Sequence, residues 1–335
     1  MNNPSLGGLL RRPEAGAFLG LVGMFIFFIV FGSIDFLKVA GAASWLNVAA
    51  NLGIVALPIG LLMIAGELDI SIGSMISAGS MTVAIISGHY HLPIWLGIAA
   101  ALSIGILVGL INGLLVIRTA VPSLIVTLGT LFAVAGLVLG LSVIITGTTS
   151  VALTAPDIAK LIFGHFIGNT FQVILVWWLI VTAIYIYFVH YSRYGNWIFA
   201  MGGDKDSARN AGIPTRRLTV TLFVLSSTSA AFVGTCQAIL FNSAQVSAGM
   251  SFIFNSIISV VVGGVLLTGG FGSVIGIFFG TITFAVVNQG IYFTSFDRNW
   301  SSLIIGVMLL LAVLMNNTFR KMALSYAPRA KKGAR

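Results

Sequence analysis

Charged residues are scarce in this chain of 335 residues, because Asp, Glu, Lys and Arg together make up only 7% of it. Soluble domains carry about 25% charged residues, so this chain cannot cover a water-exposed surface. Hydrophobic residues account for 58% of the chain, and the mean hydropathy is +1.07. The composition therefore excludes a soluble enzyme, a nucleic-acid-binding protein and a disordered chain, and it indicates helices packed in a lipid bilayer.

Cysteine is nearly absent, and so are the usual catalytic and metal-binding constellations. The single cysteine, Cys236, excludes an intrachain disulfide and an all-cysteine metal site. No lysine follows a glycine, so the chain has no phosphate-binding loop and is not expected to hydrolyse ATP itself. The only closely spaced histidines, His89 and His91, have no neighbouring carboxylate or cysteine. We expect no catalytic residue, no metal and no cofactor.

Long apolar runs are abundant. Ten runs approach the roughly 20 residues that a helix needs to cross a bilayer core about 30 Å thick. We predict an all-α integral membrane protein of about ten transmembrane helices, forming one domain over residues 1–335 with a membrane core at 17–316. Residues 255–268 form a short run that ends at a glycine-rich break, so the eighth and ninth runs are either two helices or one broken, re-entrant element. The ten predicted spans are residues 17–34, 45–65, 70–87, 93–117, 122–145, 172–191, 217–239, 255–268, 271–289 and 299–316.

The positive charges are distributed unevenly along the chain. With ten spans and a cytoplasmic N-terminus, all but three of the 17 Lys and Arg residues fall on the cytoplasmic side, where short loops are enriched in basic residues. An odd number of spans would put either the loop at 192–217 or the basic tail at 317–335 on the wrong side. We therefore predict an even number of spans and two cytoplasmic termini. The first run is expected to be an uncleaved anchor. The three outside exceptions are Lys38, Lys160 and Arg298.

Two glycine ladders predict close helix packing. Glycines recur every four residues in the fourth and ninth runs, which places a groove on one helix face where another backbone can approach. We interpret both ladders as packing features of the bundle interior. They consist of Gly105, Gly109 and Gly113, and of Gly272, Gly276 and Gly280.

The longest cytoplasmic loop, at 194–217, is the most informative segment. Gly202 and Gly203 form a break, Asp204 is a good helix N-cap, and Gly212 is a helix stop. We predict a helix of about two turns between them.

This short helix has two interpretations. Ala208, Ala211 and Ile213 form a small apolar surface that would dock into a groove on another protein. Alternatively, the segment is a solvated connector, since short capped helices are common in loops.

The cytoplasmic turn between the second and third runs carries two carboxylates. Asp69 and Ser71 are placed to cap the start of the third helix, and Gly73 follows in its first turn. The alternative is that Glu67 and Asp69 line a gate or contact the basic residues of the 194–217 loop. A position at the membrane edge favours capping.

Uncharged amides are the main polar groups within the spans, and no acid or base lies in the middle of one. Hydrogen bonds between helices explain most such amides, but a wet path for a neutral, hydroxyl-rich solute needs the same groups beside aromatic faces such as Trp45 or Phe252. The lack of buried ion pairs argues against a proton- or sodium-coupled carrier. The candidates for a translocation path are Asn47, Asn51, Asn112, Asn255 and Asn288, and further amides occur at Gln237 and Gln289.

Three segments together resemble a known family. The sequence GGDKDSARNAGI at 202–213 resembles the G-G-N-x-x-A-A-R-L-A-G-I segment of the ribose-type permeases of ATP-binding-cassette importers. LDISIG at 68–73 is similar to their I-D-L-S-V-G. VVVGG at 260–264, with the glycines and serine at 269–273, is similar to their V-V-I-G-G…G-G-x-G-S. The motifs occur in the family's order, and the resemblance extends from about residue 45 to 316.

This resemblance implies a function and partners. The chain would be the membrane subunit of a bacterial inner-membrane importer that moves a monosaccharide or related polyol by alternating access. It would pair with a second permease subunit and receive solute from a periplasmic binding protein. A cytoplasmic ATPase would dock on the 194–217 loop, with Arg209 as the first candidate for a polar contact. The alternatives are a self-sufficient secondary carrier or facilitator for a small neutral solute, and a structural membrane subunit.

Several residues depart from the family pattern. Glu67 replaces a small residue, and Asp204 replaces an asparagine. Ile253 and Asn255 stand where Glu and Asp are common, near the expected outer mouth. The solute therefore stays open among sugars, branched-chain amino acids, nucleosides and autoinducer-like molecules.

Overall fold

The structure is a computed structural model that describes residues 13–300, 302–304, 306–307, 310–311 and 314. These residues form an all-α membrane protein with two small sheets, which confirms the predicted fold class. The main helices are α2 (Pro13–Phe31), α3 (Val39–Ile64), α4 (Ile72–Val83), α5 (Ile94–Arg118), α6 (Ser123–Thr146), α8 (Ile174–Tyr191), α9 (Arg193–Gly203), α10 (Lys205–Asn210), α11 (Thr215–Phe241), α12 (Met250–Val262) and α13 (Val274–Gly290).

Shorter elements connect these helices. The two sheets are antiparallel pairs, β1 (Ser150–Ala152) with β4 (Ser243–Gln245), and β2 (Phe166–Ile167) with β3 (Phe171–Gln172). Helix α7 (Asp157–Phe163) lies between β1 and β2, and α4 continues into a π-helix, η2 (Ala84–His89). Three 3-10 turns are η1 (Ile34–Leu37), η3 (Ile291–Phe293) and η4 (Arg298–Trp300).

Seven of the described helices are long and apolar enough to cross a membrane, namely α2, α3, α5, α6, α8, α11 and α13 with its extension through η3. Each corresponds to a predicted span. The predicted span at 70–87 is divided between α4 and η2, and α12 has only 13 residues. Much of the predicted span at 299–316 and all of the tail at 317–335 lie outside the described residues. The count of ten is therefore not confirmed.

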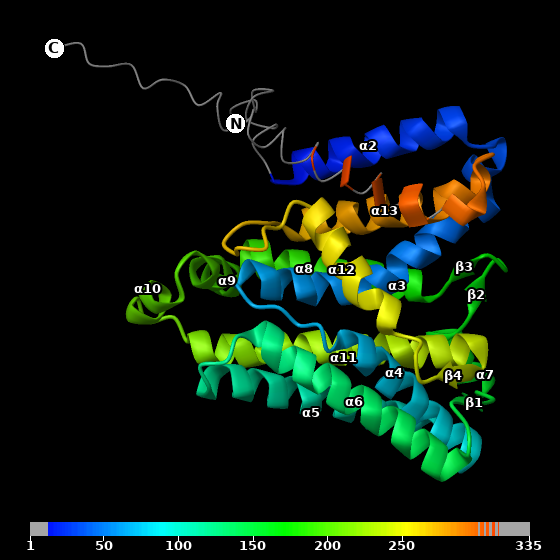
Figure 1. Cartoon of the computed structure of the whole chain (residues 1–335), viewed down its shortest axis with the longest axis horizontal. Helices are drawn as coiled ribbons and strands as arrows, with labels where there is room; N and C mark the ends of the chain where they lie inside the picture. Colours follow the sequence, from blue (N-terminus) through cyan, green and yellow to red (C-terminus); the bar gives the residue numbers. More distant parts are fainter. Residues whose placement is uncertain (1–12, 301, 305, 308–309, 312–313, 315–335) are drawn as a thin grey trace.

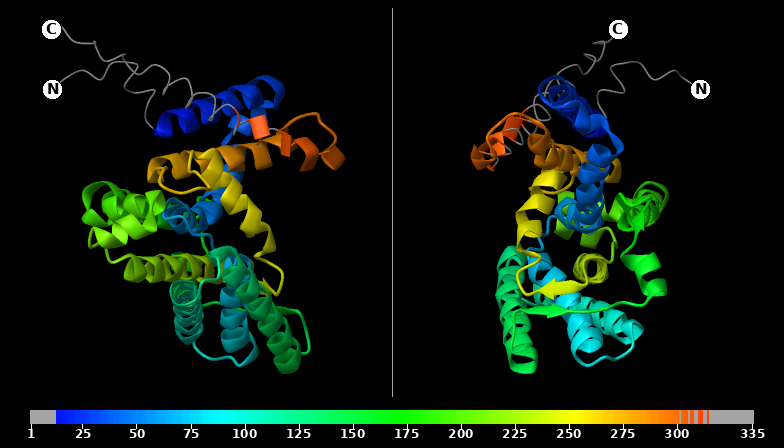
Figure 2. Two further views of the ribbon diagram at one scale, coloured as in Figure 1. Left: turned by 60° about the vertical axis from the view of Figure 1, so that its left-hand side comes forward. Right: turned by 90° about the vertical axis from the view of Figure 1, so that its right-hand side faces the viewer.

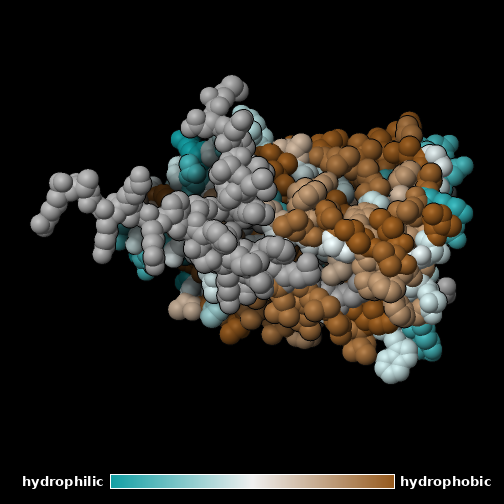
Figure 3. All heavy atoms as spheres, turned by 90° about the horizontal axis from the view of Figure 1, so that it is seen from above, coloured by the Kyte–Doolittle hydropathy of each residue, from teal (hydrophilic) through white to brown (hydrophobic). Residues whose placement is uncertain are grey.

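The helices are stacked in layers around α3. Helices α2 and α13 lie on one side, and α4, α5, α6 and α11 lie on the other, with α3, α8 and α12 between them (Figures 1 and 2). The second half of α3 is buried without interruption from Ala49 to Ile64 apart from Asn51. By contrast, much of α6 is exposed, and the visible face in Figure 3 carries a hydrophobic band between hydrophilic ends. This pattern suits a bundle surrounded by lipid.

The two ends of the bundle are built differently. Helices α9 and α10 lie at one end, together with the α3–α4 turn and the α12–α13 loop (Figure 1). The two small sheets and α7 lie at the opposite end. We call these the α10 end and the sheet end.

The glycine ladder of α5 packs as predicted. A Cβ added at Gly105, Gly109 or Gly113 would lie 2.5–2.8 Å from the Cα of Thr228, Val224 or Val220 on α11. Each next glycine of α5, four residues further along, thus faces the residue of α11 that lies four positions earlier. In the second ladder, Gly276 and Gly280 approach the backbone of α12 near Gly263. The absence of side chains therefore brings the helix axes close together.

One expectation about segment boundaries needs correction, and one open alternative is decided. The first half of the 194–217 loop is the helix α9, because Ser192 accepts a hydrogen bond from the Tyr194 N–H (3.2 Å) and Ile198 and Met201 are buried against the bundle. The runs at 255–268 and 271–289 are two separate helices, α12 and α13, joined by a loop. That loop needs glycine, since Gly264, Gly269 and Gly270 have φ values of +73° to +89°.

Candidate functional site

Helix α10 has the two caps that the sequence predicts. The Asp204 carboxylate accepts a hydrogen bond from the Ser207 N–H (2.6 Å), and the side chain and backbone of Ser207 lower the pKa of Asp204. At the other end, Gly212 has φ +85°, and the Ile213 N–H donates to the Ala208 carbonyl (3.1 Å). This is a Schellman motif, which ends a helix with a residue in the left-handed region.

The two faces of α10 differ. Ala208 is 4% exposed and belongs to the protein's own core, with Ile213 packed beside it. These two residues therefore do not offer an apolar docking surface, contrary to the sequence-based interpretation. The exposed face instead carries Ala211 and Arg209, whose guanidinium lies 2.9 Å from the Asp206 carboxylate.

Three turns of the chain meet at the α10 end. Gly202, near the end of α9, lies so close to Ile64 of α3 that a Cβ would collide with the Ile64 carbonyl oxygen. The same carbonyl accepts a hydrogen bond from the Gly270 N–H in the α12–α13 loop (2.8 Å). A Cβ on Gly269 would lie 3.1 Å from the Cα of Gly66. A Cβ added at Gly203 would meet no atom within 4 Å, so close packing requires glycine only at position 202.

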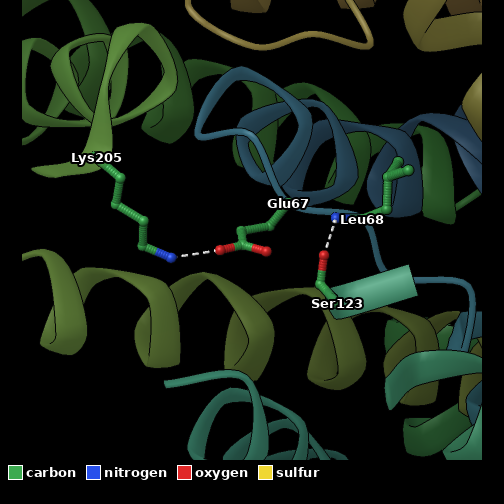
Figure 4. Close-up of polar contacts among 4 residues, drawn as sticks. All are labelled: Glu67, Leu68, Ser123 and Lys205. Carbon is green, nitrogen blue, oxygen red and sulfur yellow. Dashed lines mark hydrogen bonds and ion pairs between the residues drawn. The ribbon is translucent and has the colours of Figure 1, made fainter. Parts of the chain in front are cut away.

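An ion pair links α10 to the α3–α4 turn. The Lys205 ammonium lies 2.5 Å from the Glu67 carboxylate (Figure 4). The Glu67 side chain is only 11% exposed, against 40% for Lys205. The next residue, Leu68, donates its N–H to the Ser123 hydroxyl at the start of α6 (3.1 Å; Figure 4). Helix α10 is thus connected through the turn to the first residue of α6.

Asp69 lies deeper in the same turn. Its carboxylate accepts hydrogen bonds from the N–H (2.9 Å) and hydroxyl (2.6 Å) of Ser71, immediately before α4. Asn112 of α5 donates to the Ser71 hydroxyl (3.0 Å). Asp69 is only 1% exposed, so it lies well inside the protein. The two carboxylates therefore differ in their contacts, since Asp69 bonds Ser71, the residue before α4, and Glu67 contacts Lys205 at the start of α10.

A cavity of about 280 Å³ with amide and apolar lining residues opens between five elements, among them β3 of the sheet end. Its lining combines amides with phenylalanines and contains no charged residue. The exposed residues Phe241 and Ser251 lie at its rim. The lining residues are Asn47, Val48, Asn51 and Leu52 of α3, Gln172 of β3, Gln237 and Phe241 of α11, Ser251, Phe252 and Asn255 of α12, and Phe284 and Asn288 of α13.

The cavity brings together most of the amides that the sequence identifies as path candidates. Asn47, Asn51, Asn255 and Asn288 all line it, as does Phe252. Asn112 does not, because it is fully buried beside Ser71. Trp45 packs on Phe25 instead (ring centroids 5.3 Å apart). Gln172 also lines the cavity. The sequence does not indicate this, because Gln172 lies where a loop meets a predicted span and no local pattern predicts that its side chain faces the interior.

Gly73 occupies the contact between α4 and α12. A Cβ there would press on Ile253 and the Gly249 carbonyl oxygen. This places the start of α4 against the start of α12, on the element that supplies Asn255 to the cavity.

Comparison with known proteins identifies the chain. A family model described as "Branched-chain amino acid transport system / permease component" matches residues 41–313. The chain belongs to this family. The permease is also 29% identical over 287 residues to the fructose import permease protein FrcC of Rhizobium meliloti, which covers 83% of this chain and 78% of that protein.

Two other similar proteins are also permeases. The permease is 33% identical to the probable ABC transporter permease protein y4mJ of Sinorhizobium fredii, over 83% of this chain and 84% of that protein. It is 30% identical to the autoinducer 2 import system permease protein LsrD of Photorhabdus temperata, over 78% and 79% of the two chains. No solved structure matches.

These comparisons establish the class of protein. The chain is the multi-pass, inner-membrane permease subunit of an ATP-binding-cassette importer, a transport component rather than an enzyme. Importers of this class operate with an ATPase and a solute-binding protein as partners.

Proposed function

We propose that this permease translocates a monosaccharide or related neutral polyol by alternating access. In this proposal, a periplasmic binding protein delivers the solute, and a separate cytoplasmic ATPase drives the cycle by docking at α9 and α10. Two permease subunits, identical or related, enclose the path. The whole chain acts as one transmembrane domain, with both termini in the cytoplasm.

The cavity carries the proposal for the solute. Its lining contains four asparagines, two glutamines, one serine and three phenylalanines, and no charged group. Amides donate and accept hydrogen bonds as hydroxyl groups do, and aromatic faces cover the apolar faces of a ring. A charged amino acid would lack a counter-charge among these residues. The relatives named for fructose and autoinducer 2 import support the same class of solute.

The contacts of α10 support its role in coupling. A partner that moves α10 acts on the α3–α4 turn through Lys205 and Glu67, and on α6 through Leu68 and Ser123. The α12–α13 loop is joined to the same point through Ile64 and Gly270. Because α3, α12 and α13 also line the cavity, a displacement at the α10 end is transmitted to helices that hold the solute.

The charge distribution supports a cytoplasmic location for the α10 end. The described loops and helix ends there contain six basic residues, which are Arg118, Arg193, Lys205, Arg209, Arg216 and Arg217. The sheet end has Lys38, Lys160 and Arg298. Short cytoplasmic loops are the basic ones in membrane proteins.

The proposal is tested by sugar uptake into membrane vesicles. We expect uptake of a labelled neutral sugar only when the permease, the ATPase, the binding protein and ATP are all present. Arg209→Glu, which reverses the charge on the exposed face of α10, should abolish uptake and leave the amount of inserted permease unchanged. The matched control is Lys38→Glu, which breaks another exposed i,i+3 ion pair at the sheet end, where Lys38 lies 2.7 Å from Asp35.

Two results would contradict the proposal. Gradient-driven accumulation by the permease alone would favour a self-sufficient carrier. Normal uptake by the Arg209→Glu variant would show that α10 is not the docking site.

A further inference from the structure

One wall of the cavity is a chain of hydrogen-bonded amides with Asn51 at its centre. The Asn51 amide nitrogen donates to the Gln172 side-chain carbonyl (2.7 Å) and to the Asn47 backbone carbonyl (2.9 Å). The Asn51 side-chain carbonyl accepts a hydrogen bond from the Gln237 amide (3.3 Å). Both N–H groups and the carbonyl of Asn51 are therefore engaged, so its amide is held in one orientation.

The neighbouring asparagine anchors the same chain to the sheet end. The Asn47 side-chain carbonyl accepts a hydrogen bond from the Gln172 N–H (2.9 Å). The Asn47 amide donates to the Thr170 carbonyl (2.9 Å). Gln172 is thus fixed to α3 at its backbone by Asn47 and at its side chain by Asn51. This double attachment gives the β2–β3 hairpin a defined place at the cavity.

The orientation of Asn51 sets what the two glutamines can offer to a solute. The Gln172 carbonyl is occupied by Asn51, which leaves the Gln172 amino group as a donor. The Gln237 amino group donates to Asn51, which leaves the Gln237 carbonyl as an acceptor. Among the described residues, neither remaining group has a hydrogen-bond partner, and both residues line the cavity.

We propose that the Gln172 amino group and the Gln237 carbonyl form a donor–acceptor pair that selects the hydroxyl groups of the transported solute, with Asn51 as the positioning residue. This inference rests on the proposed function, because it requires that the cavity holds the solute. A hydroxyl group accepts from Gln172 and donates to Gln237, so a neutral polyol satisfies both. A carboxylate satisfies only the donor, and an ammonium group satisfies only the acceptor.

The opposite wall lacks this fixed arrangement. Asn288 of α13 accepts a hydrogen bond from Gln289 (2.8 Å), and the Asn255 side chain of α12 has no hydrogen-bond partner among the described residues. Those two amides stand on the helices joined by the glycine loop at the α10 end. Selection therefore belongs to the α3, β3 and α11 wall, which is preorganised.

The test measures sugar uptake by the complete transporter, with permease, ATPase and binding protein in proteoliposomes. The probes are radiolabelled D-fructose, D-ribose and D-galactose, and the best-transported sugar is compared with analogues that each lack one hydroxyl group. The variants are Gln172→Leu, Gln237→Leu and Asn51→Asp. The control is Gln245→Leu, an exposed glutamine on β4 outside the cavity lining.

We expect the half-saturating sugar concentration to rise about tenfold in each variant, as loss of one hydrogen bond of ordinary strength would produce. The amount of inserted permease should stay at the wild-type level in each variant, and Gln245→Leu should keep the wild-type half-saturating concentration. The wild type should transport one deoxy analogue less well than the parent sugar. The Gln172→Leu and Gln237→Leu variants should transport that analogue and the parent sugar equally well. The same binding protein is present in all assays, so its own preference among sugars does not affect the comparison between permease variants. Asn51→Asp should reproduce the effect, because a carboxylate cannot donate to Gln172.

Two outcomes separate this inference from the proposed function. If the wild-type complex transports a neutral sugar and the three variants keep its half-saturation and its discrimination, the donor–acceptor pair is wrong and the proposed function stands. If the wild-type complex transports no neutral sugar, both are overturned.

Discussion

The ion pair between Glu67 and Lys205 shows how one side chain connects two distant parts of the chain. The residues are 138 positions apart, yet their charged groups are in contact (Figure 4). Glu67 is nearly buried, so its carboxylate depends on this partner more than an exposed carboxylate would.

The first prediction at this scale is a charge exchange. Lys205→Glu should reduce ATP-driven uptake about tenfold or more, because two carboxylates then face each other across a partly buried contact. The double variant Glu67→Lys with Lys205→Glu should recover most of the activity. Uptake and ATPase rates of the purified complex provide the measurement.

The exposed pair Lys38–Asp35 supplies the control for this exchange. Exposed pairs contribute about 0–1 kcal/mol, so Lys38→Glu should change uptake little. If the double exchange fails to recover activity while each permease is inserted normally, the ion pair does not transmit motion.

At the scale of elements, the packing of α5 on α11 is the clearest case of sequence determining geometry. Three glycines four residues apart bring α5 onto the backbone of α11 at Val220, Val224 and Thr228. Glycines on α6 behave differently, because a Cβ added at Gly129, Gly136 or Gly140 would meet no atom within 4 Å. Gly136 and Gly140 are also four residues apart, so this spacing between two glycines indicates close packing only where a partner helix is present.

This contrast gives a stability prediction with an internal control. Gly109→Ala should destabilise the permease by about 1–3 kcal/mol, because its Cβ would lie 2.5 Å from the Val224 Cα and the helices would have to separate. Gly136→Ala should be neutral or slightly stabilising, since alanine is the better helix former and the site is open. Thermal unfolding in detergent, followed by fluorescence, measures both. Equal effects of the two substitutions would disprove close packing at Gly109.

For the whole molecule, the main feature is the difference between its two ends. The α10 end joins three turns through backbone contacts, whereas the sheet end closes with short antiparallel strands beside the cavity. In the proposed function, the cavity near one end holds the solute and the α10 end receives the ATPase, so the two tasks lie at opposite ends of the bundle.

The orientation of these ends is open to direct measurement. Cys236 is buried, so the unmodified permease should react poorly with a membrane-impermeant maleimide. Asn210→Cys on α10 should be labelled only after the cells are permeabilised, and Gln245→Cys on β4 should be labelled in intact cells. Both residues are exposed, so their access to reagent is comparable. Labelling of Asn210→Cys in intact cells would reverse the proposed orientation.

The sequence alone determined the class of fold and the local signals along the chain. A charged fraction of 7% excludes a soluble fold, and the apolar runs locate most helices. The caps of α10 at Asp204 and Gly212 were predictable because capping depends on residues within a few positions of each other. The set of three motifs was enough to suggest the family, which the comparisons confirm.

Only the tertiary structure decided which distant groups meet. Asn47, Asn51, Asn255 and Asn288 share a cavity, whereas Asn112 is buried elsewhere, and local sequence cannot separate them because each is an amide in an apolar run. Ala208 is buried in the core of the bundle whereas Arg209 beside it is exposed, which depends on how α10 packs against the rest of the chain. Glu67 meets Lys205, and Gln172 meets Asn51, only through the packing of elements more than a hundred residues apart. Such contacts arise from the three-dimensional arrangement of the helices. Short-range patterns of hydrophobicity and charge do not specify which residues of two distant helices lie opposite each other.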